Sequence, residues 1–297
     1  MKISHAHSIS HPAGADPPRG LFIMDFDGTL LGSDRTVARV DLNALEKIGR
    51  QAVVRVIATG RSLYVFNTAV TEVLPVDFII FSMGAGVLQY PVGKIVRSVS
   101  LDPNEVMQAY SVLKACGLDF MVHRRIPENH WFSYHRSTSH NPDFERRLSR
   151  YKRFAAPFTQ APDGFGPASQ LLAVVSHREG KDMLEKVRGL LPDFSVIQST
   201  SPLDGKSTWI KVFPAAVSKS LTAGWLAEKL DIAKSEIVSV GNDYNDLDLL
   251  EWAAESYVVD NATADLKNRF ARVASNDHGG VAEAAKRWLT ERYKVKG

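Results

Sequence analysis

The sequence predicts an α/β protein: a doubly wound parallel sheet of the Rossmann-like kind, interrupted by an inserted α+β domain. Continuous apolar segments alternate with segments of helical spacing near both ends of the chain, which is the pattern of parallel sheets. The alternation stops near residue 100 and returns after residue 213. At 297 residues with 44% hydrophobic content, the chain is long enough for two domains. We therefore expect a flexible tail over 1–19, a core built from 20–99 and 214–297, and an inserted domain over 100–213.

The first predicted strand leads into two carboxylates. Leu21 to Met24 is an apolar run, and the chain continues as Asp25-Phe26-Asp27-Gly28-Thr29-Leu30. Residues two apart in an extended segment face the same side, so we expect the two acids to converge. Two carboxylates that close repel each other unless a cation or a proton lies between them. The pair therefore indicates either a metal site or an acid/base pair.

The rest of the first segment alternates in the same way. Apolar residues at helical spacing predict a helix over Val37–Ile48, closed by Gly49. The β-branched run Ala52–Ala58 predicts a strand buried on both faces, and it ends in Thr59-Gly60-Arg61. A helix over Leu63–Val73 and a strand over Asp77–Phe81 follow, so we expect parallel strands joined by right-handed crossovers.

The inserted domain begins with a strong helix signal. Asp102-Pro103-Asn104-Glu105 combines a capping residue, a proline at the first helical position and an acid at the third, and the helix is predicted to end near Cys116-Gly117. The segment 155–167, rich in proline and glycine, predicts a loop. The other elements expected here are strands at Phe120–His123, Leu171–Ser176, Ser195–Gln198 and Trp209–Phe213, and helices at Pro142–Tyr151 and Lys181–Leu190.

The last segment returns to the parallel pattern. Ser218 is a suitable cap for a helix running to Leu230, which places Lys219 in the first turn. The strand predicted at Ile237–Val240 ends in Gly241-Asn242-Asp243-Tyr244-Asn245-Asp246. The remaining expected elements are helices at Leu247–Ala253, from Ala262 and from Gly280, and strands at Tyr257–Val259 and Arg272–Ala274.

Composition narrows the class of protein. A net charge of +3 gives no general argument for binding nucleic acid or a membrane surface, and no run approaches the ~18 apolar residues of a membrane span. Cys116 is the only cysteine, which excludes an intramolecular disulfide and fits a reducing compartment. We expect a cytoplasmic protein, monomeric or weakly dimeric, that binds no nucleic acid and no membrane. Nothing fixes the geometry of His5, His7 and His11 in the tail for a metal.

Four polar clusters stand at the ends of predicted elements: Asp25 with Asp27, Thr59 with Gly60, Lys219, and the loop from Asn242 to Asp246. Three of the four follow a strand directly. In a doubly wound sheet the functional crevice lies beyond the carboxyl ends of the strands, so we expect the clusters to meet there. Together they supply a nucleophile, a hydroxyl donor, a cation and oxygen ligands for a metal, which are the parts that phosphoryl transfer requires.

These clusters resemble, in order and at fitting spacings, the four motifs of the haloacid dehalogenase-like hydrolases. The place of the insert, after the third strand, resembles the Cof-like branch with its α/β cap, and the resemblance covers about residues 20 to 290. The residues that carry it are Asp25-Phe26-Asp27-Gly28-Thr29-Leu30, Ala58-Thr59-Gly60-Arg61, Lys219 after Pro214-Ala215-Ala216-Val217-Ser218, and Gly241-Asn242-Asp243-Tyr244-Asn245-Asp246.

The resemblance implies a role for each matched residue. Asp25 would attack phosphorus to form an aspartyl-phosphate, and Asp27 would protonate the leaving oxygen and then activate water. Thr59 would bind a phosphoryl oxygen, and Lys219 would neutralise the charge shared by nucleophile and phosphoryl group. The other residues implied are Gly60, Arg61 and Asn245 for phosphate binding, and Asp25, Asp27, Asn242, Asp243 and Asp246 around Mg2+.

The sequence departs from the family pattern in the fourth motif, which commonly begins Gly-Asp. Here Asn242 stands in the ligand position as a neutral amide, supported by Asp246, unless Asp243 takes over as the ligand. The sequence alone leaves both alternatives open. A second departure is Met83, where relatives often have asparagine. Arg61 has two interpretations as well, either a contact to substrate or a partner for a structural carboxylate.

The function predicted from these residues and the resemblance is a Mg2+-dependent phosphatase acting on a small phosphorylated metabolite, with sugar phosphates favoured. A phosphotransferase or mutase using the same chemistry is the alternative, and a non-catalytic binding protein on this fold is the alternative of a different class. Basic residues gather in the inserted domain without the stacking motifs of RNA binders, and those that face a cleft would favour anionic substrates: His123, Arg124, Arg125, His135, Arg136, Arg146, Arg147 and Arg150.

Overall fold

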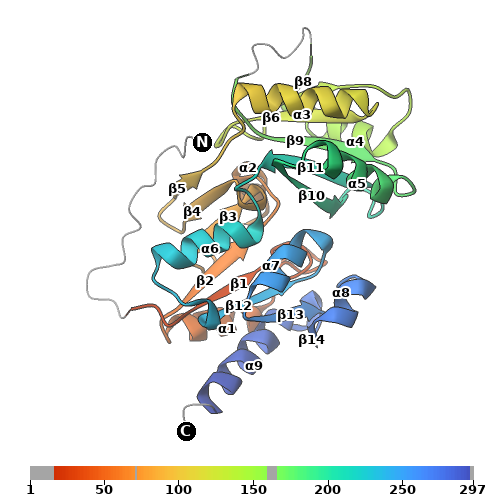
Figure 1. Ribbon diagram of the computed structural model, residues 1–297. Coiled ribbons are helices and arrows are strands. Elements are labelled where there is room, and N and C mark those ends of the chain that lie inside the picture. Colours follow the sequence, from red (N-terminus) through yellow and green to blue (C-terminus); the bar gives the residue numbers. More distant parts are fainter. Residues whose placement is uncertain (1–16, 71, 159–165, 295–297) are drawn as a thin grey trace. The chain divides into compact units, whose positions relative to one another are not determined.

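The computed structural model describes residues 17–70, 72–158 and 166–294, with side chains described to residue 290. The chain divides into two compact units, one made of Met1–Arg97 with Ser218–Gly297 and the other of Ser98–Val217. Figure 1 shows the first unit in red, orange and blue and the second mainly in yellow and green. Of the tail predicted over 1–19, residues 1–16 lie outside the described residues.

The first unit contains an eight-stranded sheet in the order β14-β13-β12-β1-β2-β3-β4-β5. The pairings from β14 through β13, β12, β1 and β2 to β3 are parallel, and β4 pairs antiparallel with β3. The strands are β1 (Gly20–Met24), β2 (Val53–Ala58), β3 (Phe78–Phe81), β4 (Gly86–Gln89), β5 (Lys94–Ser98), β12 (Ile237–Gly241), β13 (Glu255–Val259) and β14 (Ala271–Val273). Because β1 lies between β12 and β2, its carboxyl end has the ends of both neighbours beside it.

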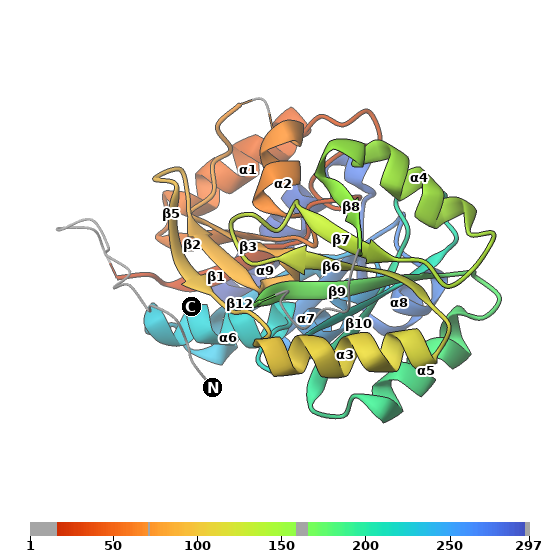
Figure 2. The ribbon, with the colours of Figure 1, turned by 90° about the horizontal axis from the view of Figure 1, so that it is seen from above.

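Helices pack on both faces of this sheet, which explains why its central strands are continuously apolar. On one face Leu21 and Ile23 share a core with Leu226 and Leu249, from the helices drawn in cyan and light blue in Figures 1 and 2. On the other, Phe22 contacts Trp288, with ring centroids 6.0 Å apart. The helices of this unit are α1 (Arg39–Gly49), α2 (Leu63–Ala69), α6 (Lys219–Lys229), α7 (Leu247–Trp252), α8 (Ala264–Arg269) and α9 (Gly280–Lys294).

Most predicted elements of the first unit are confirmed within two residues, but two features differ. The helix α2 ends at Ala69 rather than near Val73, because Val70 adopts an extended conformation (φ −101°, ψ 114°). Strands β4 and β5 were not predicted. The chain reverses after β3 through positive φ angles at Ser82, Met83 and Gly84, and positive φ is uncommon for the two residues of the three that carry a Cβ.

The second unit is a six-stranded sheet, in the order β10-β11-β9-β6-β7-β8, with helices on both faces. Helices α3 and α5 share a core with one face, and α4 covers part of the other. The strands are β6 (Asp119–Arg124), β7 (Phe132–His135), β8 (Ala155–Pro157), β9 (Ala168–Val175), β10 (Phe194–Thr200) and β11 (Thr208–Pro214), and the helices α3 (Pro103–Ala115), α4 (Pro142–Arg150) and α5 (Gly180–Leu190).

The helix signal at residue 102 is confirmed in detail. Asp102 accepts a hydrogen bond from the Glu105 amide at 2.9 Å, and the Glu105 side chain accepts from the Asp102 amide at 2.8 Å. Strand β7 was not predicted, and the segment expected as a loop over 155–167 begins as strand β8, with 159–165 outside the described residues. Within the described part of the chain, no helix combines the length and apolar character needed to cross a membrane.

Candidate active site

A buried lysine joins two carboxylates at the carboxyl edge of the first unit's sheet. Asp25 follows β1 and continues its pairing, with its amide 2.9 Å from the Val240 carbonyl. The Lys219 ammonium donates to Asp25 Oδ1 at 2.6 Å and to Asp246 Oδ1 at 2.5 Å. The side chain of Lys219 is fully buried, and so is that of Asp246. Three residues separated by up to 221 positions in the chain thus share one buried charge network.

The local sequence explains how Lys219 reaches that position. Ser218 caps α6 by accepting the Leu221 amide at 3.1 Å, so Lys219 opens the helix in its first turn. Asp248 accepts the Ser220 amide at 3.0 Å, which ties the start of α6 to α7. The amino terminus of α6 therefore has two side-chain caps, and Lys219 starts from a fixed backbone.

Asp246 organises the fourth-motif loop as well as the lysine. Its second oxygen, Oδ2, accepts the backbone amides of Asn242 at 2.9 Å and Asp243 at 3.2 Å. Gly241 makes this closure achievable, since a Cβ at that position would lie 2.7 Å from Asp246 Cβ. With both oxygens engaged, Asp246 acts in this structure as a partner of Lys219 and of the loop backbone.

Burial makes the charges of this network strongly interdependent. Burial, reinforced by the negative charge of Asp246 and opposed by the cation of Lys219, raises the pKa of Asp25 to about 8. Burial by itself would lower the pKa of Lys219, but the charges of Asp246 and Asp25 outweigh it and raise that pKa above its ordinary value. The lysine is therefore protonated. Burial thus disfavours a negative charge on Asp25 even beside Lys219, and an additional cation would stabilise its ionised form.

Asp27 does not share the buried network of Asp25, although the two acids are only two residues apart. Its carboxylate is half exposed and accepts hydrogen bonds from Arg61, from Nε at 2.8 Å and from Nη2 at 2.5 Å. The guanidinium is itself held by the Val65 carbonyl at 3.4 Å and by the ring of Phe26, 5.2 Å from its Cζ. Of the two interpretations of Arg61, the structure shows a carboxylate partner, and that partner is Asp27.

Thr59 lies fully buried at the end of β2, where its hydroxyl accepts the Arg61 amide at 3.1 Å. Its carbonyl accepts the amide of Met83 at 3.1 Å, and the Arg61 carbonyl accepts that of Ser82 at 2.8 Å. The loop after β3 is thereby bonded to the loop after β2. Ser82 and Met83 both have positive φ, 50° and 58°, a strained conformation for residues with a Cβ that these hydrogen bonds stabilise.

The same strained loop reaches α6 and the fourth motif. The Gly84 carbonyl accepts the hydroxyl of Thr222 at 2.9 Å, and the amide of Asn245 points to the Met83 sulfur at 3.9 Å. Met83 thus contacts one of the residues expected near phosphate. The strand ends of β2, β3 and β12 and the start of α6 are connected to one another through this loop.

Asn242 lies against the first motif. Its Oδ1 is 3.3 Å from the Thr29 hydroxyl. Gly28 has φ 73°, and a Cβ there would lie 2.6 Å from Asn242 Nδ2, so both the turn and the approach of Asn242 require glycine. Asn261 donates to the Gly28 carbonyl at 2.8 Å and fixes the turn from its other side.

The residues present fit a hard cation such as Mg2+. Asp25 Oδ2 has no hydrogen-bond partner among the described residues, and the Asp27 carbonyl and the Asn242 amide oxygen belong to adjoining loops. These are the oxygen donors that Mg2+ prefers. In the described part of the chain, no three or more acids, histidines or cysteines form a metal-binding group. Residue 242 is an amide and not an acid, and Asp246 is bonded to Lys219. Among the described residues, Asp25 therefore has no group of acids beside it that could bind a metal in the usual number.

Several residues that shape the site carried no recognisable signal in the sequence. Asp248, Thr222 and Asn261 each hold a functional loop through one hydrogen bond to backbone. Such contacts depend on loops from distant segments and leave no periodic pattern. Only Asp248 could have been suspected, as an acid placed shortly after the fourth motif.

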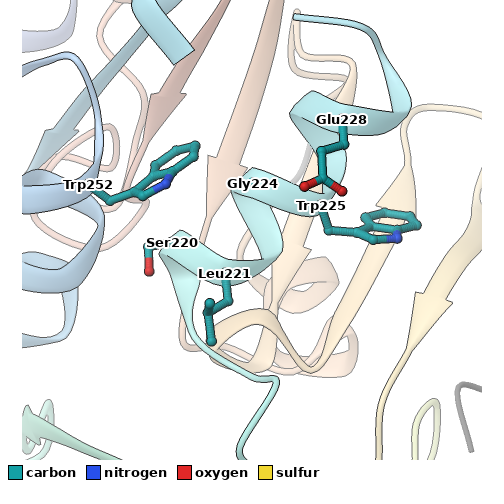
Figure 3. Close-up of a pocket in the computed structure, with 6 residues that line it drawn as sticks. All are labelled: Ser220, Leu221, Gly224, Trp225, Glu228 and Trp252. Carbon is teal, nitrogen blue, oxygen red and sulfur yellow. The ribbon is translucent and has the colours of Figure 1, made fainter. Parts of the chain in front are cut away.

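A shallow groove of about 320 Å³ lies elsewhere in the first unit, on the outer side of α6 and α7. Figure 3 shows the indole rings of Trp225 and Trp252 on either side of Gly224. Leu221, Ser220 and Glu228 complete its lining. The groove includes none of the residues that the four motifs supply, so it is separate from the charge network around Asp25.

Comparison with known proteins gives a consistent result. A family model described as haloacid dehalogenase-like hydrolase matches residues 22–284. Phosphatase YwpJ of Bacillus subtilis is 24% identical over 287 residues, covering 91% of this chain and 99% of that protein. Among solved structures, the phosphatase BT1666 from Bacteroides thetaiotaomicron superposes with a TM-score of 0.73 at 21% identity, covering 95% of this chain and 99% of the other. The subclass IIB sugar phosphatase BT4131 gives a TM-score of 0.68 at 18% identity, with 91% and 99% covered.

Proposed function

This chain belongs to the haloacid dehalogenase-like hydrolases, in the Cof-like branch, and is a phosphatase of that superfamily; we propose that it is a Mg2+-dependent enzyme that hydrolyses a small phosphorylated metabolite, with sugar phosphates favoured. The observation that carries the proposal is the buried bridge from Lys219 to Asp25 and Asp246. It fixes one oxygen of Asp25 and leaves the other without a partner among the described residues, as a positioned nucleophile requires.

In the first half of the reaction, Asp25 Oδ2 forms a bond to phosphorus while the bond from phosphorus to the leaving oxygen breaks. The product is an aspartyl-phosphate and an alcohol, and the alcohol oxygen takes a proton from Asp27. In the second half, water attacks the same phosphorus and gives a proton back to Asp27. Inorganic phosphate leaves, and both acids return to their starting states.

The proton-transfer role requires Asp27 to leave Arg61 and to take up a proton from the solvent before the leaving oxygen can receive that proton. The contact between them is partly exposed, with half of the Asp27 side chain accessible. Ion pairs of this kind contribute about 0–1 kcal/mol, so the carboxyl can turn away at small cost. Arg61 then becomes available for a substrate oxygen. Arg61 thus pairs with Asp27 between turnovers. During turnover it is a candidate ligand for the phosphate of the substrate.

Phosphoryl oxygens are received by groups at the same edge of the sheet. The Thr59 hydroxyl, the Gly60 amide and the Asn245 amide are the proposed donors, and Lys219 supplies a positive charge beside the nucleophile. Lys219 is preorganised, because its ammonium is held at 2.6 Å from Asp25 before any substrate binds. Removal of a single donor of this kind typically lowers kcat by about 100-fold to 1000-fold.

Asp25, the Asp27 carbonyl and Asn242 are the residues that would hold Mg2+. When bound, Mg2+ would neutralise the charge of the phosphoryl oxygens. We favour Asn242 over Asp243 because the amide oxygen of Asn242 lies against the first-motif loop, 3.3 Å from Thr29 Oγ1. Asp246 supports the same group indirectly, through the amides of Asn242 and Asp243. The second unit is proposed to act as the cap that sets substrate specificity.

Hydrolysis of p-nitrophenyl phosphate tests the proposal. We expect turnover with Mg2+, none in excess EDTA, and loss of turnover in Asp25→Asn and Asp25→Ala. Asp193→Asn, which changes an exposed acid of the second unit, is the matched control and should retain full activity. Turnover that survives both Asp25 substitutions would refute the mechanism.

A further inference from the structure

Two asparagines from a distant part of the chain hold the loop that carries Asp27. Asn261, after β13, donates from Nδ2 to the Gly28 carbonyl at 2.8 Å. Asn276, after β14, donates from Nδ2 to the Leu31 carbonyl at 3.0 Å. The paired residues are 233 and 245 positions apart in the chain, and all of them belong to the first unit.

The two hydrogen bonds act on the backbone on either side of Asp27. On one side, Gly28 follows Asp27 directly, and Asn261 fixes its carbonyl. On the other side, the Phe26 carbonyl accepts the Leu31 amide at 2.8 Å, and Asp27 and Leu31 form an isolated β-bridge. Because Asn276 holds the carbonyl of the same Leu31, Asp27 lies between two backbone groups that asparagine side chains keep in place.

The two asparagines are also joined to each other. Asn261 Oδ1 accepts the backbone amide of Asn276 at 3.0 Å. A backbone amide only donates and a carbonyl only accepts, so both ends of the Asn261 side chain are assigned by their partners, and an aspartate could satisfy only one of them. Asn276 is buried, with 6% of its surface exposed. Asp277 extends the contact by accepting the Ser33 amide at 2.7 Å.

Proton transfer makes the position of this backbone important. Among the described residues, the carboxylate of Asp27 is hydrogen-bonded only to Arg61, and that contact has to break before the carboxyl can reach the substrate. A general acid must come within about 2.6–3.2 Å of the oxygen that it protonates. A displacement of about 1 Å can lower the rate by about 100-fold. Once Asp27 leaves Arg61, its reach is therefore set by where the loop holds its backbone.

We propose that Asn261 and Asn276 are positioning residues for proton transfer by Asp27, because they hold the backbone from which its carboxyl reaches the leaving oxygen. This inference rests on the proposed function and extends it to two residues outside the four motifs. The proton passes from the Asp27 carboxyl to the leaving oxygen, which keeps the electron pair of its broken bond to phosphorus. Neither asparagine gains or loses a proton.

Two aryl phosphates that differ in their leaving oxygen test the proposal. p-Nitrophenolate is a weak base that leaves readily without a proton, whereas phenyl phosphate, of nearly the same shape, releases a more basic oxygen that needs one. The ratio kcat/KM covers the reaction up to release of the leaving group, so the later attack of water does not enter it. At saturating Mg2+, Asn261→Ala should lower kcat/KM by at least about tenfold for phenyl phosphate and by less than about threefold for p-nitrophenyl phosphate.

Further variants identify the hydrogen bonds that matter. Asn261→Asp keeps the acceptor for the Asn276 amide but has no donor for the Gly28 carbonyl, so it should show the same selective loss as Asn261→Ala. Residue 261 is exposed, which makes this change compatible with folding. Asn276→Ala should act in the same direction, because it frees the Leu31 carbonyl. Asn268→Asp, at an exposed position of α8, is the matched control and should change neither substrate. Thermal unfolding checks that each variant is folded.

Asp27→Asn supplies the reference, and it separates failure of this inference from failure of the proposed function. Since it removes the proton donor, it should lower kcat/KM more for phenyl phosphate than for p-nitrophenyl phosphate. If Asp27→Asn affects both substrates equally, the acid role in the proposed function fails, and this inference fails with it. If Asp27→Asn shows the difference but the folded Asn261 variants lower both substrates by the same factor, within about twofold, or lower neither, the asparagines only support the fold. That result would overturn the positioning role and leave the proposed function standing.

Discussion

Replacing Lys219 by methionine is the most direct test of the buried charge network. The change keeps much of the side-chain volume but removes the ammonium that lies 2.6 Å from Asp25 and 2.5 Å from Asp246. Each contact corresponds to a Coulomb energy of about 6 kcal/mol at an effective dielectric constant of about 20. Desolvation offsets most of this, and loss of one partner from a buried pair typically costs about 3–5 kcal/mol. We expect Lys219→Met to lower the free energy of unfolding by that amount.

The double variant Lys219→Met/Asp246→Asn separates stability from catalysis. Removing the second buried charge should restore about 2 kcal/mol, since one unpaired carboxylate remains instead of two. It should restore no turnover, because the cation beside Asp25 is still missing and kcat should stay at least about 100-fold below the wild type. Urea denaturation and p-nitrophenyl phosphate kinetics measure the two effects. A single variant within about 1 kcal/mol of the wild type, or a double variant with restored activity, would refute the interpretation.

Three further outcomes follow from the same structure. Arg61→Met should change the unfolding free energy by less than about 1 kcal/mol, because the ion pair between Arg61 and Asp27 is partly exposed. The same substitution should lower kcat, and an unchanged kcat would exclude Arg61 from the reaction. Asn242→Asp should lower the Mg2+ concentration needed for half activity by about tenfold, whereas a larger effect of Asp243→Ala would make Asp243 the ligand. Burial raises the pKa of Asp41 to about 6. The free energy of unfolding of the wild type should therefore fall by up to about 3 kcal/mol as pH rises from about 4 to 6, and Asp41→Asn should not show this fall. Urea denaturation at several pH values measures the difference.

The stability effect at Asp41 has a structural cause. Asp41 is fully buried in the first turn of α1, and its Oδ1 accepts the Ala282 amide of α9 at 2.7 Å. Its Oδ2 has no partner among the described residues. The folded state therefore holds the proton more tightly than the unfolded state, and between about pH 4 and 6 the carboxyl ionises in the unfolded chain but stays protonated in the folded protein. An asparagine keeps the acceptor for Ala282 without the charge.

The elements predicted best from the sequence are those with the strongest physical signal. A strand buried on both faces is a continuous apolar run, and β1, β2, β3 and β12 were all recognised by it. The hairpin β4–β5 lies beside the parallel strands, and its strands have mixed burial, so the apolar signal is weak. The turn from β3 into β4 depends on positive φ at Ser82 and Met83, which the surrounding hydrogen bonds stabilise.

The candidate site shows the same division. Strand order explains why the ends of β1, β2 and β12 are neighbours, and the sequence was sufficient to place these motifs together. The sequence was not sufficient to predict the partner of each side chain, because Asp246 could equally have faced a metal or Lys219. The choice depends on the amides of Asn242 and Asp243, which the turn after β12 aims at Asp246. Likewise, Asp27 pairs with Arg61 and not with Asp25 because of the positions of two loops, which no local pattern encodes.

The neutral side chain at position 242 alters the charge that the site offers to a phosphate. When Asp25 is ionised, Asp25, Asp246 and Lys219 together carry a net charge of about −1, and the pair of Asp27 with Arg61 is neutral. A divalent cation would bring the site to about +1, whereas an aspartate at position 242 would bring it to about zero. The amide should therefore weaken the hold on the cation and strengthen the attraction for a dianionic phosphate. Accordingly, Asn242→Asp should be inhibited less by inorganic phosphate, even as its requirement for Mg2+ falls.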